Sequence, residues 1–203
     1  MTKRYAKQQR WKSYVAISKQ RRSVERSGSG QEYVERLELL MNQAGVDVNY
    51  SPARSAALLK EETTGRPAGA MVLPDGSVVT GKTSDLLGAA SSLLMNALKG
   101  VAGVDDAVDV ISNEVIEPIC ELKTSTLNSR NPRLHSDETL LALSVTSATD
   151  PLAKQLIDHA GDLKGCDAFF SVIISSTDEK LYRTLGINVC CEPKYEQRRY
   201  YHR

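Results

Sequence analysis

The hydrophobic pattern between residues 68 and 100 constrains the fold of this chain more than any other stretch. Residues 68–73 and 77–80 favour strands, and Pro74-Asp75-Gly76 between them is a typical turn sequence. The segment that follows, LLGAASSLLMNALK, has so wide an apolar face that we expect a helix covered on most sides. A β-hairpin followed by such a helix predicts a sheet for the helix to cover.

The C-terminal third predicts a second part of the same sheet. Residues 168–175 and 187–191 are typical of strands, and residues 178–185 of a short helix that ends at Gly186. Two strands joined by one short helix favour a parallel βαβ unit with a right-handed crossover. Three helices are expected between the hairpin and this unit, around residues 115–126, 137–147 and 151–160.

Helical patterns also precede the hairpin, over residues 5–26, 29–44 and 51–64. The predicted fold class is α/β: a β-hairpin, a buried helix, a helical middle and a closing βαβ unit, with one mixed sheet of about four or more strands. We divide the chain into an N-terminal helical extension (residues 1–66), an α/β domain (67–193) and a basic C-terminal tail (194–203). With 203 residues and 41% hydrophobic content, the chain can bury one core with a helical extension beside it.

The net charge of +1 conceals basic ends and an acidic middle. Residues 1–26 carry nine Lys or Arg against one acid, and residues 194–203 carry four against one. Basic stretches can contact nucleic acid, so RNA binding through the helix from Lys3 to Arg26 is one hypothesis. Without a recognised nucleic-acid-binding motif we expect solvated faces or contact with an acidic partner instead, and nucleic acid is the less favoured partner.

Cellular location and metal binding are constrained by missing features. No apolar run reaches the roughly 18 residues of a membrane span, and the first residues lack the apolar core of a secretory signal, so we expect a cytoplasmic protein without membrane contact. The four cysteines, Cys120, Cys166, Cys190 and Cys191, show no C-x-x-C spacing and favour free thiols. No zinc-protease or zinc-deaminase motif occurs, and neither a metal nor a cofactor is predicted.

The letters from Gly76 to Thr83 match those of a Walker A phosphate loop. The interior of the motif, residues 77–80, prefers an extended backbone, which conflicts with a loop that must curl its amides around phosphate. We therefore expect a hairpin here and no nucleoside-triphosphate loop. Thr83 and Ser84 are instead predicted to cap a helix that starts near Asp85, and with Lys82 they form a candidate anion site; the alternative is a solvated lysine beside an ordinary cap.

Four other residues are candidates for chemistry. They are Glu117 and Lys123 in the string EPICELKT, His135 in NPRLHSDE and Cys166 in LKGCDA. Each also has an ordinary explanation: an exposed helix side for the first two, a surface histidine near a helix start, and a small buried cysteine. Asp178, after VIISST, is the nearest acid to a strand end that a phosphate loop could use for its metal.

Several strings resemble a known family when taken in order. They are LPDGSVVTGKTSDLLGAASSLLMNALK, VIEPICELKTSTLNSRNPRLHSDETLLALS, LKGCDA and LGINVCCEP. Together they are similar to the C-terminal part of the bacterial family called domain of unknown function 1846. Members are usually more than twice as long as this chain and have an N-terminal α/β domain with its own glycine-rich loop. The resemblance therefore implies a split gene, a truncated reading frame or a fragment.

The resemblance also implies a pocket and one departure from the family. Matching strings carry over the following residues as pocket candidates: Lys82, Thr83, Asn96, Glu117, Lys123, Asn131, His135 and Cys166. In the family LKGCDA is followed by histidine and a small hydroxyl residue, whereas this chain has Phe169-Phe170. If that histidine acts with Cys166 and His135, this copy has lost one member.

The sequence leaves two functional hypotheses open. In the first, the chain is a module of a larger metabolic enzyme and binds an anionic small molecule near Lys82 and Thr83. In the second, it is a non-catalytic oligomerisation or assembly module, and its partner is a second copy or the missing N-terminal domain. Neither the substrate nor the reaction follows from the residues.

Overall fold

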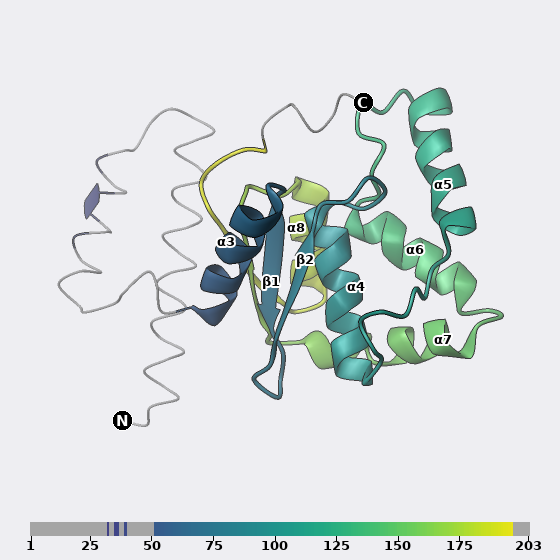
Figure 1. Cartoon of the computed structure of the whole chain (residues 1–203), viewed down its shortest axis with the longest axis horizontal. Helices are drawn as coiled ribbons and strands as arrows, with labels where there is room; N and C mark the ends of the chain where they lie inside the picture. Colours follow the sequence, from purple (N-terminus) through teal and green to yellow (C-terminus); the bar gives the residue numbers. More distant parts are fainter. Residues whose placement is uncertain (1–31, 33–34, 37–38, 40–50, 197–203) are drawn as a thin grey trace.

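The computed structural model describes residues 32, 35–36, 39 and 51–196 (Figure 1). Most of the two helices predicted before residue 45 lies outside the described residues, as does the basic segment proposed for RNA contact. The four described residues before position 51 are helical, in agreement with the helix predicted over 29–44. Within the described part of the chain, no helix is long and apolar enough to cross a membrane.

The core is one four-stranded mixed sheet, as predicted. Its strands are β1 (Ala68–Val72), β2 (Val78–Lys82), β3 (Asp167–Phe170) and β4 (Asn188–Cys191), in the order β2-β1-β3-β4. Strand β1 pairs antiparallel with β2 and β3, whereas β3 and β4 run parallel. Gly76 takes a φ of +89° at the turn between β1 and β2, which suits glycine. The predicted hairpin and the closing parallel unit are both confirmed.

Helices cover both faces of the sheet (Figure 1). Helix α3 (Pro52–Thr64) packs on one face; Ser51 caps it and Gly65 ends it, as predicted. Helix α4 (Ala89–Ala102) packs on the other face, mainly against β2. It is buried along most of its length, because its wide apolar stripe contacts the sheet on one side and the helical middle on the other.

The position of the start of α4 corrects a prediction. Strand β2 continues to Lys82 and α4 begins at Ala89, so Thr83 and Ser84 lie in a loop and do not cap a helix near Asp85. The ladder continues past Thr80 because Gly81 and Lys82 pair with Gly69 and Ala68 of β1. Helix α4 crosses β2 at Gly81, where a Cβ atom would overlap the backbone of Leu93. Residues 76–83 are thus a turn and an extended strand, and no phosphate loop is formed.

The helical middle consists of short helices. They are α5 (Asn113–Glu121), which continues as a π-helical turn η2 (Leu122–Thr126), α6 (Ser136–Thr146), α7 (Pro151–Asp158) and the 3-10 turn η3 (Ala160–Leu163). Helix α8 (Ser176–Thr184) then connects β3 to β4, with its Tyr182 ring 5.5 Å from that of Phe170. Strand β3 ends at Phe170, earlier than predicted, because the hydroxyl of Ser171 accepts from the N–H of Ala68 (3.0 Å) in place of a backbone carbonyl. Of the residues that follow, 172–175 form one wall of a cavity.

Candidate functional site

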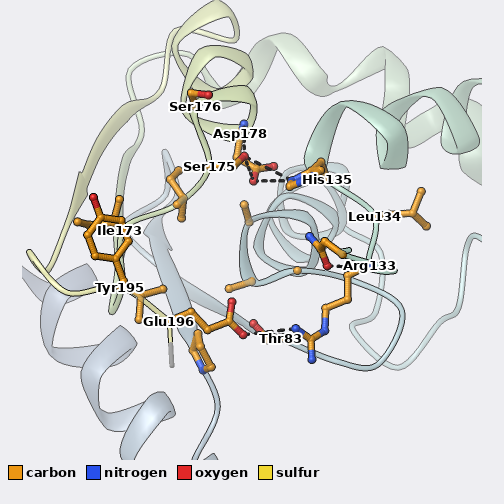
Figure 2. A pocket seen from close by; sticks show the side chains of 17 residues that line it. Thr83, Arg133, Leu134, His135, Ile173, Ser175, Ser176, Asp178, Tyr195 and Glu196 are labelled. Atoms are coloured by element: carbon orange, nitrogen blue, oxygen red, sulfur yellow. Dashed lines mark hydrogen bonds and ion pairs between the residues drawn. The ribbon is translucent and has the colours of Figure 1, made fainter. Parts of the chain in front are cut away.

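A cavity of about 420 Å³ opens beyond the carboxyl end of β3 (Figure 2). Its wall contains the first residues or caps of three helices, α4, α6 and α8. The rest comes from the strip before α6, from the loop after β2 and from Tyr195 and Glu196. Because the amino end of a helix carries partial positive charge, three such ends make the cavity suited to negative groups.

Leu134 fixes the strip of chain that carries two polar side chains of the cavity. Its N–H donates to the carbonyl of Leu86 (2.9 Å), and its carbonyl accepts from Gly88 N (3.3 Å) and Ser91 Oγ (2.6 Å). Leu134 is itself buried, and its neighbours along an extended chain point the opposite way. Arg133 and His135 accordingly face the cavity while Leu134 points away from it, as Figure 2 shows.

Arg133 brings a buried guanidinium group to one side of the cavity. Its Nε donates to the carbonyl of Ser84 (2.8 Å), and its Nη1 lies 3.3 Å from Oε1 of Glu196. The side-chain oxygen of Asn131 accepts from Arg133 N at 3.1 Å. A guanidinium group keeps its charge when it is buried, so this wall offers a fixed positive group that Glu196 partly neutralises.

The first turn of α4 opens onto the same cavity. Gly88 caps the helix with an extended backbone and has no side chain to accept from the turn. The amides of Ala89, Ala90 and Ser91 have no acceptor among the described residues. Thr83 is only 2% exposed, and its hydroxyl also has no partner in the described part of the chain. The wall therefore holds several hydrogen-bond donors without an acceptor.

His135 and Asp178 form an ion pair on the opposite side of the cavity. Asp178 Oδ2 lies 3.1 Å from His135 Nδ1, and Asp178 Oδ1 accepts from the N–H (2.8 Å) and the hydroxyl (2.7 Å) of Ser136. The hydrogen bond with Asp178 raises the pKa of His135, although partial burial opposes the shift. Burial alone would raise the pKa of Asp178, but the hydrogen bonds from His135, Ser175 and Ser136 more than offset it and hold that pKa below its usual range.

Ser175 belongs to this cluster without forming a catalytic triad. Its hydroxyl donates to Asp178 Oδ2 (2.6 Å) and lies 3.4 Å from His135 Nδ1. In a Ser-His-Asp triad the serine and the aspartate face different ring nitrogens. Here both face Nδ1, and Nε2 has no partner among the residues that the structure describes. In this same set of residues, no three His, Cys, Asp or Glu side chains are grouped to hold a metal ion.

Lys123, a predicted catalytic candidate, lies behind the cavity wall. Its Nζ donates to the carbonyl of Arg133 and to Glu138 Oε2, both at 2.6 Å. The same Glu138 oxygen accepts from His135 N at 2.7 Å. Lys123 and Glu138 hold the backbone on both sides of Leu134 and so position Arg133 and His135. Neither of the two side chains is part of the cavity lining.

The other predicted residues separate into two groups. Thr83, Asn131 and His135 line the cavity together. The following residues are absent from its lining: Lys82, exposed at the end of β2; Ser84, bonded to Leu87; Asn96, which donates to the carbonyl of Thr80; Glu117, exposed on α5; and Cys166, buried before β3. Burial raises the pKa of the Cys166 thiol to about 11. All four cysteines are buried and free, as predicted.

Arg133, Ser175 and Asp178 were not selected from the sequence as pocket residues. A signal for two of them was present, because Ser175-x-x-Asp178 before a short helix is an N-cap pattern, and Ser175 does accept from Asp178 N. The same holds for His135-x-x-Glu138 at the start of α6. Each pattern indicates where a helix begins, but neither pattern indicates that the two helix starts face each other.

Comparison with known proteins decides the family. Residues 49–201 match the family described as domain of unknown function DUF1846, C-terminal. The chain belongs to this family. Similar DUF1846 relatives are UPF0371 proteins of Corynebacterium efficiens (47% identical over 166 residues), Corynebacterium diphtheriae (45% over 176) and Streptococcus pyogenes (41% over 168). These alignments cover 82%, 87% and 83% of the chain but only 34%, 35% and 34% of the relatives, so the chain spans about a third of their length.

The Phe169-Phe170 pair, at which the chain was expected to depart from the DUF1846 family, lies in the centre of the sheet. Phe169 is buried beneath the guanidinium of Arg54, which lies 5.9 Å from the ring centroid, whereas Phe170 packs on Tyr182. Neither side chain lines the cavity. The two residues fill the core on either face of β3, so position 169 does not place a side chain beside His135.

Proposed function

We propose that this chain binds an anionic small molecule, one that carries a phosphate or carboxylate group, in the cavity between Arg133 and the first turn of α4. The observation that carries the proposal is that the uncapped turn and the buried hydroxyl of Thr83 belong to the same cavity wall. Neither has a hydrogen-bond acceptor among the described residues. Amide and hydroxyl donors that are kept from water lose free energy unless an acceptor reaches them. A ligand with several acceptor oxygens meets this requirement.

Helix α6 supports the proposal by contrast. The N–H of Ser136, in its first turn, already donates to a carboxylate of the chain itself, that of Asp178 (2.8 Å). Among the residues that the structure describes, no carboxylate accepts from the first turn of α4. One helix start is thus satisfied by the protein, and the neighbouring one is left for a ligand.

The ligand site is proposed to serve a larger protein. The chain corresponds to about a third of its UPF0371 relatives, so the remaining parts of such a protein could supply further groups to the cavity. The hypothesis of a module of a metabolic enzyme is consistent with this length. The ligand-binding step itself can be tested on the present chain.

Titration of the purified full chain with inorganic phosphate, citrate and ATP, followed by calorimetry and thermal unfolding, tests the proposal. Ala89→Pro removes one amide donor at the first helical position, where proline is tolerated and where Gly88 already has the extended backbone that proline requires. Since one charge-assisted hydrogen bond is lost, we expect affinity for the bound anion to fall about tenfold or more. Thr83→Val removes the hydroxyl with little change in volume and should act in the same direction.

The matched control is Asn113→Pro, the same change at the first position of α5, whose cap Ser112 is also extended and which does not line the cavity. This variant should bind the anion as the unmodified chain does. Absence of binding by all three anions, or equal loss in Ala89→Pro and Asn113→Pro, would reject the proposed site.

A second candidate function is assembly with another copy of the chain. Leu141 and Val145, one turn apart on α6, are 67% and 72% exposed and form an apolar pair on the surface. Sedimentation equilibrium of the full chain should show a dimer that Leu141→Glu weakens, whereas Leu59→Glu on α3, where Leu59 is 60% exposed, should leave the mass unchanged. A monomer at all concentrations would exclude this function.

A further inference from the structure

We infer that His135 is the acid–base group of the cavity and that its Nε2 exchanges a proton with the bound ligand. The inference rests on the proposed function, because it requires a ligand held by Arg133 and the first turn of α4. It deepens that function by adding a class of chemistry. The ligand would be an anionic molecule with an oxygen that gives or takes a proton during a reaction.

The contacts of His135 determine which nitrogen is available. Asp178 is ionised near neutral pH and can only accept, so the Nδ1 atom 3.1 Å away must carry the hydrogen. The neutral ring then has its lone pair on Nε2. Nε2 has no partner among the described residues, and His135 lines the cavity. The neutral imidazole therefore has a lone pair without a partner among the described residues, and the ring belongs to the wall of the space in which the ligand is proposed to bind.

Charged groups from several elements surround this ring. Asp178 faces it from α8, Glu138 from α6 through the His135 amide, and Lys123 from η2. Arg133 and Glu196 lie across the cavity as an ion pair. The hydrogen bond with Asp178 has the largest effect and favours the imidazolium, so the ring can both accept a proton and hold it.

The proposed step transfers one proton. The bond between a ligand oxygen and its hydrogen breaks, a bond from that hydrogen to Nε2 forms, and Asp178 balances the charge of the resulting imidazolium. In the reverse direction the imidazolium returns the proton to a ligand oxygen. Asp178 acts as a positioning residue because it holds the ring and its tautomer without touching the ligand.

Other nucleophilic side chains in the described part of the chain fit this chemistry less well. The Ser175 hydroxyl donates to Asp178 and lies near Nδ1, so Nε2 cannot deprotonate it. Cys166 is buried outside the cavity, and burial keeps its thiol protonated. Compared with Ser175 and Cys166, His135 combines a place in the lining with a lone pair that has no partner among the described residues.

NMR of the full chain with labelled histidines tests the inference. At high pH the nitrogen shifts of His135 should show hydrogen on Nδ1 and a lone pair on Nε2. Saturating inorganic phosphate should raise the His135 pKa by about 1 unit, because a negative charge in the cavity that the ring lines favours the imidazolium. His159, which pairs with Asp162 outside the cavity lining, is an internal control whose NMR signals should not move when phosphate is added.

The outcomes separate this inference from the proposed function. Phosphate binding without a change in the His135 pKa, or a hydrogen on Nε2 in the neutral ring, would overturn the inference and leave anion binding intact. Absence of binding by phosphate, citrate and ATP alike would remove both, and if only citrate or ATP binds, that anion replaces phosphate in the titration. Asp178→Asn should lower the His135 pKa by about 1 unit and reduce the preference for the Nδ1–H form; should that variant fail to fold, the two measurements on the unmodified chain decide.

Discussion

The carboxylate of Asp178, on α8, lies 3.1 Å from Nδ1 of His135, the residue that caps α6. The same carboxylate accepts from the backbone of Ser136 in the first turn of α6 (2.8 Å). One side chain thus joins two helix starts and orients the imidazole in the cavity lining. Its position follows from the βαβ unit, which brings the start of α8 to the carboxyl end of β3 beside α6.

The ion pair predicts how stability depends on pH. The raised pKa of His135 contributes stability that is complete below its ordinary value of 6.5 and is lost as pH rises through the folded value. The lowered pKa of Asp178 contributes stability above its ordinary value of 3.8 that is lost as pH falls through the folded value. His135→Gln should therefore lower the free energy of unfolding most between these two values, by about 2 kcal/mol, and less at alkaline pH. Urea titrations across this range measure it, and a cost independent of pH would contradict the pairing.

Lys123 is predicted to be a structural residue, although it was a candidate for catalysis. Its ammonium group is buried between Glu138 and the carbonyl of Arg133, so Lys123→Met removes its hydrogen bonds to both. We expect a loss of about 3 kcal/mol in the free energy of unfolding, measured with urea. Lys154→Met, which breaks an exposed surface pair with Asp158, should cost less than about 0.5 kcal/mol. Equal effects of the two variants would contradict the buried role of Lys123.

Glu196 is predicted to compete with an anionic ligand for Arg133, from which it lies 3.3 Å away. Glu196→Gln removes a negative charge from the cavity wall and keeps the size of the side chain. Affinity for phosphate should rise about fivefold, the effect of losing one modest ion pair, and calorimetry would show it. Weaker binding would mean that Glu196 supports the ligand instead.

Two glycines of the Walker-like string should respond differently to alanine. Gly81→Ala places a methyl group against the backbone of Leu93, which cannot move without shifting α4, so we expect a loss of about 3 kcal/mol or more. Gly76→Ala meets no atom within 4 Å and costs only the strain of its positive φ, about 1–2 kcal/mol. Thermal unfolding of both variants provides the comparison, and the reverse order would contradict the close approach of α4 to β2.

The four cysteines are predicted to be unreactive in the folded chain. All are buried, and burial raises the pKa of the Cys120 and Cys166 thiols. Ellman's reagent at pH 8 should label the native protein slowly and should report four thiols once urea unfolds it. Rapid labelling of Cys166 before unfolding would reopen its role as a nucleophile.

Local patterns in the sequence were sufficient for the elements of this fold. The hairpin around Gly76, the caps Ser51 and Asp150 and the closing strand-helix-strand unit all depend on neighbours within a few residues, which are fixed by backbone sterics and side-chain caps. The predicted start of α4 near Asp85 was wrong because the contacts that determine this region are not local in the sequence. The ladder extends to Lys82 because that residue pairs with Ala68 of β1, and α4 packs on Gly81 through Leu93, which is twelve residues farther along the chain.

The sequence by itself therefore determined the family, the α/β class and the order of the elements. Ordered strings of residues indicate the family, and hydrophobic periodicity and turn residues indicate the class and the order of the elements. Only the tertiary structure decided which polar residues meet. Thr83, Arg133, His135 and Asp178 line one cavity, and Lys123 lies behind its wall. Cys166 and Glu117 lie outside the cavity lining. The physical reason is that Asp178 reaches His135 across 43 positions of sequence, through the packing of α8 against α6. No local preference encodes a contact between two helix starts that the sheet brings together.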